Sequence, residues 1–164
     1  MGKSGLRCHY KSRGRESRAG SGADEVFVGM SEHNLDAKGR LVLPAKFRDA
    51  FNGQGYLVFS SDDVLQLWTA AEFHRSMKAL QPDISAPEDE HRLFRRLSSF
   101  SSEVEVEPSQ GRIAIPVKLR ELAHLTVGQP VQISGTYSHI ELWNPKDFER
   151  RVLLIDDTQG GIQA

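Results

Sequence analysis

An internal repeat limits the folds open to this chain more than any other feature of its sequence. Residues 38–49 read Lys-Gly-Arg-Leu-Val-Leu-Pro-Ala-Lys-Phe-Arg-Asp, and residues 110–121 read Gln-Gly-Arg-Ile-Ala-Ile-Pro-Val-Lys-Leu-Arg-Glu. The Gly-Arg pair, the proline, the lysine and the later arginine are identical, and every apolar position stays apolar. Farther along, a Leu-Trp pair also recurs, as residues 67–68 and 142–143. The chain therefore contains two copies of one unit, and we expect its function to lie on a feature that both copies build.

Each copy spans about 50 residues, which is close to the smallest size that can bury a hydrophobic core alone. We therefore expect the two copies in this 164-residue chain to pack on each other or on other subunits. The residues before position 26 are rich in Gly, Ser and Arg, with little to bury. The predicted parts are a disordered basic extension (1–25), a first unit (26–74), an inserted helical segment (75–101), a second unit (102–149) and a C-terminal tail (150–164).

The two units share one predicted order of elements. Each begins with a strand, turns at a glycine, continues into an apolar strand, and then has a proline that suits the first position of a short helix. A pair of strands closes each unit. In the first unit we predict strands opening at 26–28 and at 41–43, a helix at 45–51, and paired strands at 56–60 and 64–68. In the second unit we predict strands at 104–106 and 113–115, a helix at 116–122, and paired strands at 131–133 and 140–143.

Two helices are predicted between the units, at 70–80 and 87–100. In the second of them, Leu93, Leu97 and Phe100 fall on one face at spacings of four and three residues. This apolar face predicts either packing in the core or a subunit interface.

The sequence contains no arrangement typical of catalytic residues. Asp62 and Asp63 are adjacent and suit a turn, and His33 has no partner at metal-binding spacing. The chain lacks a phosphate-binding Gly-rich loop, and its single Cys8 excludes an intrachain disulfide. We therefore expect no enzymatic activity, cofactor, bound metal or small-molecule substrate. No apolar run approaches the roughly 20 residues of a membrane span, so we expect a cytoplasmic protein without a membrane partner.

The Gly-Arg turn has a specific chemistry. In the first copy Gly39 can adopt a positive φ angle, which lets the chain reverse sharply and brings Lys38 and Arg40 to one edge. Asp36 can accept backbone hydrogen bonds in the turn and hold the arginine in place. A guanidinium held in this way can bind phosphate or the O6 and N7 atoms of guanine.

One such turn alone would be interpreted as a solubilising β-turn. Its return with Gly111 and Arg112 favours a binding role, because a merely solvated turn does not need the same cation in both copies. The formal net charge of the chain is −1, so any basic surface for nucleic acid must be local and built from a few residues.

Residues 33–48, which read His-Asn-Leu-Asp-Ala-Lys-Gly-Arg-Leu-Val-Leu-Pro-Ala-Lys-Phe-Arg, resemble the opening segment of the MraZ family almost position for position. MraZ proteins are two-unit members of the AbrB/SpoVT group of swapped-hairpin DNA-binding proteins, and the resemblance covers about residues 26–150. It implies an α+β, mainly β fold. In that fold, two tandem swapped-hairpin β-units form a pseudo-twofold, barrel-like core, with helices inserted between them.

The same resemblance implies a function. It points to a sequence-specific transcriptional regulator that assembles into a homo-oligomeric ring. Such a ring would bind short direct repeats of double-stranded DNA in the promoter of the division and cell-wall gene cluster, in the cytoplasm at the nucleoid. The DNA-binding residues that the resemblance implies are Asp36, Lys38, Gly39, Arg40, Gln110, Gly111 and Arg112.

Two residues of the second copy depart from the family pattern. Pro108 stands where the family has an acidic residue, and Gln110 replaces Lys38 of the first copy. We therefore expect the second turn to be less cationic and Arg112 to be held less firmly.

The alternative to DNA binding is a non-enzymatic, oligomeric protein-interaction module whose turns contact another protein.

Overall fold

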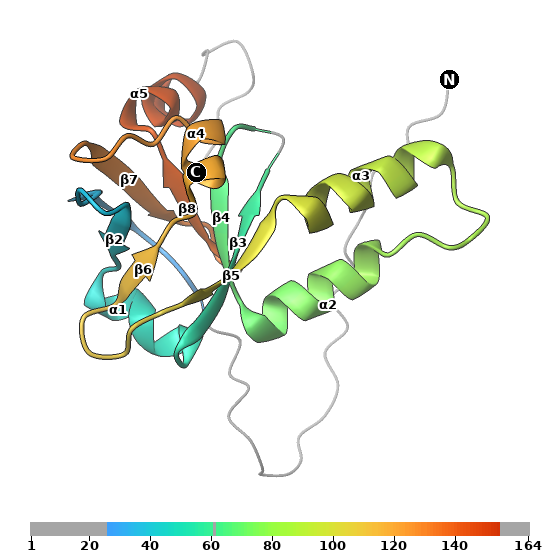
Figure 1. Cartoon of the computed structure of the whole chain (residues 1–164), viewed down its shortest axis with the longest axis horizontal. Helices are drawn as coiled ribbons and strands as arrows, with labels where there is room; N and C mark the ends of the chain where they lie inside the picture. Colours follow the sequence, from blue (N-terminus) through green and yellow to red (C-terminus); the bar gives the residue numbers. More distant parts are fainter. Residues whose placement is uncertain (1–25, 61, 155–164) are drawn as a thin grey trace, which may run out of the picture.

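The computed structural model describes residues 26–60 and 62–154, which have the predicted α+β architecture with mainly antiparallel strands (Figure 1). In Figure 1 the strands lie together and helices α2 and α3 extend away from them. The strands are β1 (Met30–Asn34), β2 (Arg40–Val42), β3 (Gln54–Phe59), β4 (Leu65–Thr69), β5 (Ser101–Glu105), β6 (Arg112–Ala114), β7 (Pro130–Gly135) and β8 (Ile140–Trp143). The helices are α1 (Ala45–Arg48), α2 (Ala70–Leu80), α3 (Glu88–Ser99), α4 (Val117–Leu122) and α5 (Pro145–Phe148), with a 3-10 turn at Asp49–Phe51 and a π turn at Glu149–Leu153.

The strands form a six-stranded antiparallel sheet, in the order β1-β7-β8-β4-β3-β5, and a separate two-stranded ribbon of β2 and β6. The two repeat units exchange strands in both. The first strand of each unit pairs with the closing hairpin of the other, since β1 pairs with β7 and β5 pairs with β3. The six-stranded sheet is open at β1 and β5, so hydrogen bonds between the described strands do not close it into a barrel. The barrel-like core stays a prediction.

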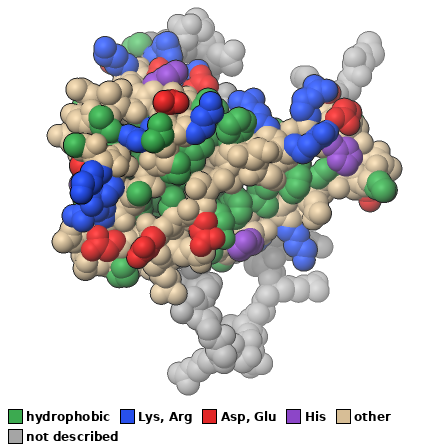
Figure 2. Space-filling model, in the orientation of Figure 1, with side chains coloured by type: hydrophobic (Ala, Val, Ile, Leu, Met, Phe, Trp, Pro, Cys, Tyr) green, Lys and Arg blue, Asp and Glu red, His purple; other side chains and the backbone are tan. Residues whose placement is uncertain are grey.

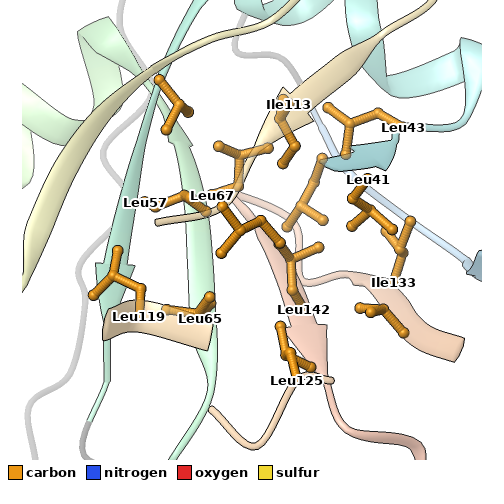
Figure 3. Packing of buried hydrophobic residues seen from close by; sticks show 14 of the residues in the cluster. Leu41, Leu43, Leu57, Leu65, Leu67, Ile113, Leu119, Leu125, Ile133 and Leu142 are labelled. Atoms are coloured by element: carbon orange, nitrogen blue, oxygen red, sulfur yellow. The ribbon is translucent and has the colours of Figure 1, made fainter. Parts of the chain in front are cut away.

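One hydrophobic cluster serves both units. Leu41 of β2 lies opposite Ile113 of β6, and both side chains are buried. Figure 3 shows them in the same cluster as Leu43, Leu67 and Leu142. Because this cluster draws on strands from both copies, neither copy encloses a core of its own. Of the two expected arrangements, packing of the units on each other or on other subunits, the structure shows the first.

Most of the predicted elements lie near their expected places. The inserted helices predicted at 70–80 and 87–100 are α2 and α3. Thr69 caps α2, because its hydroxyl oxygen accepts a hydrogen bond from the backbone N–H of Glu72 at 3.3 Å. The two predicted closing hairpins are β3 with β4 and β7 with β8.

The first strand does not open at residues 26–28 as predicted. It begins at Met30, because Gly29 has a φ angle of +89°, a left-handed conformation that interrupts an extended strand. Phe27 instead forms an isolated bridge with Tyr137, and its ring is buried in the core. The predicted extension over 1–25 and residues 155–164 of the predicted tail lie outside the described residues.

The apolar face predicted on the second inserted helix is only partly packed. No residue of α3 is buried, and Leu93 is 49% exposed, so the core interpretation is wrong for this residue. Phe100, which directly follows α3, does pack against the core, with its ring centre 6.4 Å from that of Phe59. A subunit interface at Leu93 stays a prediction.

Candidate nucleic-acid interface

The first Gly-Arg turn joins β1 to β2 and is closed by the side chain of Asp36. Its Oδ1 accepts hydrogen bonds from the backbone N–H groups of Lys38 and Arg40, each at 2.9 Å. Its Oδ2 accepts a third, from Arg40 Nε, at 2.8 Å. Gly39 has a φ angle of +75°, and its N–H donates to the Asp36 carbonyl at 3.0 Å. The predicted role of Asp36 in holding this turn and its arginine is therefore confirmed.

Asp36 is held in its charged form. The hydrogen bond from the backbone N–H of Arg40 has the largest effect, and the Arg40 guanidinium adds to it, so the pKa of Asp36 lies below its ordinary value of 3.8. The side chains of Asp36 and Arg40 are 39% and 35% exposed. An ion pair this exposed contributes little to folding stability, so its main effect is to fix the direction of the guanidinium.

The second turn, between β5 and β6, holds its arginine with different residues. In the first turn the N–H of Asp36 donates to the Arg40 carbonyl at 2.9 Å. Pro108, at the position of Asp36, has no N–H, and the N–H of Glu107 donates to the Arg112 carbonyl instead, at 3.1 Å. This turn is therefore one residue longer than the first. Arg112 Nη2 donates to Gln110 Oε1, and Arg112 Nη1 lies 3.9 Å from Glu107 Oε2. Arg112 thus has two side-chain partners in place of one aspartate.

Glu107 is not among the site residues predicted from the sequence. The alignment of the two copies places Pro108 opposite Asp36, and the acidic group of the second turn comes one position earlier. A glutamate next to an unexpected proline was the available signal, since the longer side chain can reach an arginine from a shifted position.

The two arginines lie on one face of the β2–β6 ribbon. In the antiparallel register they flank the buried central pair, Leu41 and Ile113, and the alternation of side chains along each strand turns both arginines toward solvent. The side chain of Arg112 is 35% exposed, the same as that of Arg40. The ribbon therefore places the two predicted turns, which are far apart in the sequence, at its two ends with both arginines on one face.

A groove of about 610 Å³ beside the ribbon is lined by both arginines and by carboxylates. The carboxylates belong to Glu103, Glu105 and Glu107, along β5 and just after it. Figure 2 shows Lys and Arg side chains gathered at the left, over the region of β2 in Figure 1, with Asp and Glu side chains near them. Positive and negative side chains therefore alternate at the ribbon, and any basic surface there is built from a few residues, as the net charge of the chain predicts.

Lys38 and Gln110 occupy equivalent positions in the two turns, and both side chains are exposed. Gln110 orients Arg112, whereas the ammonium group of Lys38 adds a positive charge to the first turn. The first turn is therefore the more cationic, as the sequence predicts.

Gly39 and Gly111 are buried, and each lies under an arginine of the other unit. A Cβ atom on Gly39 would lie 2.6 Å from Cζ of Arg120, and one on Gly111 would lie 2.6 Å from Nε of Arg48. These two arginines are not among the site residues predicted from the sequence. The available signal was the repeat itself, in which this later arginine is identical in both copies.

The paired aspartates singled out in the sequence lie outside this interface. Asp62 and Asp63, predicted in a turn, lie 4.0 and 3.2 Å from the guanidinium of Arg151 and form surface ion pairs. Residues 26–60 and 62–154 contain no group of three or more His, Cys, Asp and Glu arranged to hold a metal ion. Within the same ranges, no helix has both the length and the apolar character needed to cross a membrane.

Similarity to known proteins extends over nearly all of the described residues. A family model with the description "MraZ protein, putative antitoxin-like" matches residues 26–97 and 100–152. A protein of Thermomicrobium roseum named "Transcriptional regulator MraZ" is 32% identical over 79% of this chain and 89% of its own length. Proteins with the same name from Syntrophobacter fumaroxidans and Salinispora arenicola are 33% and 30% identical, over 80% and 84% of this chain and 88% and 95% of their own lengths.

The two segments that match the family model each contain one copy of the repeat with its Gly-Arg turn. The similarity to the three relatives extends over about four fifths of the chain, well beyond the turns themselves. By these matches, the chain belongs to the MraZ family.

Proposed function

We propose that this chain is a sequence-specific, DNA-binding transcriptional regulator and that its two Gly-Arg turns contact double-stranded DNA. One observation carries the proposal: Arg40 and Arg112 extend from the solvent face of one two-stranded ribbon, each oriented by residues of its own turn. The major groove of B-DNA admits such a ribbon, and a guanidinium can bond the O6 and N7 atoms of guanine in two places. The names of the relatives, which are transcriptional regulators, support the same function.

The residues of the turns have different roles in this proposal. Arg40 and Arg112 contact base edges or phosphates, and Lys38 adds a mobile charge that binds phosphate. The shape of the turns and the direction of the arginines are set by the remaining residues, Asp36, Gly39, Gln110 and Gly111.

We further propose that the subunits assemble into a homo-oligomeric ring. The ring binds short direct repeats in the promoter of the division and cell-wall gene cluster, in the cytoplasm at the nucleoid. A subunit with a net charge of −1 has little overall attraction for DNA, but several subunits on neighbouring repeats multiply weak contacts through effective concentration. The exchange of strands between the two units supports the swapped-hairpin, barrel-like core that the family resemblance implies.

The carboxylates beside the arginines favour a second candidate function, a non-enzymatic protein-interaction module. Glu103, Glu105 and Glu107 line the same groove as the two arginines. These carboxylates would repel a phosphate backbone that entered the groove, whereas a protein partner of mixed charge could bind there. The two candidates therefore differ in which surface binds: the turns alone, or the turns together with the groove.

A gel-shift titration over a salt series distinguishes the two functions. The probe is a labelled duplex with the chromosomal sequence directly upstream of this protein's own gene, and the control is a duplex of unrelated sequence. For DNA binding through the turns, the logarithm of the association constant falls steeply and linearly with the logarithm of salt concentration, and the upstream duplex is preferred. Absence of binding to the upstream duplex at low salt would contradict the proposal and favour the protein-interaction module.

A further inference from the structure

The side chain of Arg48 reaches from the first repeat unit to the turn of the second. Its Nη1 donates a hydrogen bond to the carbonyl of Ser109, between Pro108 and the Gly-Arg pair, at 3.0 Å. Its Nε and Nη2 donate to the carbonyl of Leu43 at 3.3 and 3.2 Å. The guanidinium of Arg48 is therefore bound to backbone carbonyls from both units, which leaves it poorly placed to bind DNA itself.

The same guanidinium covers Gly111. The φ angle of Gly111 is +67°, and a Cβ atom there would lie 2.6 Å from Arg48 Nε and 3.1 Å from the Leu43 carbonyl oxygen. The N–H of Leu43 donates to the Gly111 carbonyl at 2.8 Å. Two residues of the first unit thus hold the second turn immediately before Arg112. Arg48 binds the Ser109 carbonyl and packs on Gly111, and Leu43 binds the Gly111 carbonyl.

Arg120 is the equivalent residue of the second unit, and it holds the first turn less strongly. It packs on Gly39, and the N–H of Ile115 donates to the Gly39 carbonyl at 2.9 Å. Among the hydrogen bonds of the described residues, however, none joins the Arg120 side chain to this turn, and its buried Nε has no partner. The first turn has Asp36 to hold it from within, and the second turn has no equivalent aspartate.

We propose that Arg48 is a positioning residue for Arg112, acting across the boundary between the two units. It fixes the second turn from outside, where Pro108 prevents the internal arrangement that Asp36 makes in the first. This role needs a planar group with several N–H donors, which lysine does not provide. The inference rests on the proposed function for its effect on DNA binding, while the effect on the turn itself can be tested without DNA.

Hydrogen–deuterium exchange of the full-length protein tests the effect on the turn. Arg48→Lys keeps the charge but loses the planar group, and Arg120→Lys is the matched control at the equivalent position. In Arg48→Lys we expect faster exchange in the peptide covering 107–112, because the N–H groups of Glu107 and Gly111 report closure of this turn. The peptide covering 36–40 should be unchanged. Unchanged exchange at 107–112, or an equal increase in both peptides, would overturn the proposal.

A double-mutant cycle on the upstream duplex tests the effect on DNA binding. Arg48→Lys should weaken binding by up to about tenfold, roughly the effect of one hydrogen bond. In an Arg112→Ala background it should cause no further loss, because the residue through which it acts is gone. Losses that multiply in the double variant would mean that Arg48 contacts DNA directly and would overturn the proposal. If the wild-type protein does not bind the duplex at all, the proposed function fails, and the exchange measurement still decides whether Arg48 holds the turn.

Discussion

The two Gly-Arg turns place their arginines on the same face of the β2–β6 ribbon, but they hold them by different contacts. In the first, one carboxylate, that of Asp36, binds two backbone N–H groups and the arginine. In the second, a proline removes this possibility, the turn is one residue longer, and Gln110, Glu107 and Arg48 share the task. The arginine side chain is 35% exposed in both. The position of the arginine is therefore the common feature of the two copies, and unrelated contacts can support it.

The difference has a functional consequence under the proposed role. The first turn has Lys38 beside its arginine and is held from within, whereas the second has Gln110 and depends on a residue of the other unit. We therefore expect the first turn to contribute more to DNA affinity, and the second to be more sensitive to changes elsewhere in the chain.

The largest effect is expected from separating the two copies. Residues 26–97 expressed alone should show no cooperative thermal unfolding, because β1, β2 and β3 lose their partner strands β7, β6 and β5, and the common core is divided. Circular dichroism during heating checks this prediction. A cooperative transition for the isolated segment would show that one unit has a core of its own, and the comparison of two interdependent turns would no longer hold.

A smaller effect is expected from alanine at the two turn glycines. Each alanine must adopt a left-handed backbone, which costs roughly 1–2 kcal/mol. The new Cβ in Gly39→Ala meets the end of the flexible Arg120 side chain, whereas in Gly111→Ala it also approaches the Leu43 carbonyl at 3.1 Å. Gly111→Ala should therefore lower the free energy of unfolding more than Gly39→Ala does. Denaturant titration of both variants measures this difference, and a greater loss for Gly39→Ala would contradict the account.

The smallest effect concerns pH and only the first turn. The pKa of Asp36 is lowered in the folded protein, so its stabilisation of the turn is fully present above the ordinary value of 3.8 and is lost as the pH falls through the lower, folded value. The carbon-13 resonance of the Asp36 carboxyl group should titrate with a midpoint below 3.8, and the Arg40 Nε–H resonance should move with the same midpoint. The Arg112 Nε–H resonance should not follow it. A midpoint at or above 3.8 would mean that Asp36 does not hold the turn in solution.

The sequence predicted well those features that depend on residues close together along the chain. The hydrogen bonds of Asp36 reach at most four positions along the chain, and the helix ends depend on local residues such as Thr69. The sequence pattern also predicted that each copy packs on the other copy or on other subunits, because each is too small for its own core. For these features, the types of residues and their spacing along the chain determine the structure.

Features that depend on distant contacts could not be predicted in the same way. Arg48 binds a carbonyl 61 residues away, and the exchange of strands between the units has no local signal. Glu107 takes its role only because Pro108 shifts the backbone hydrogen bonds by one position. Gly29 interrupts the predicted first strand through a φ angle that the apolar pattern around it does not reveal.

Whether two unequal turns contact DNA can be decided by measuring the affinity of Arg40→Ala and Arg112→Ala for the upstream duplex at one salt concentration. Leu43→Ala is the control, because it removes a buried side chain and should cost about 2–5 kcal/mol of stability. Both arginine variants should unfold at nearly the wild-type temperature. Arg40→Ala should lose about 1–3 kcal/mol of binding free energy per contacted site, and Arg112→Ala should lose less. Wild-type affinity in Arg40→Ala, or a loss that only accompanies unfolding as in Leu43→Ala, would contradict the account.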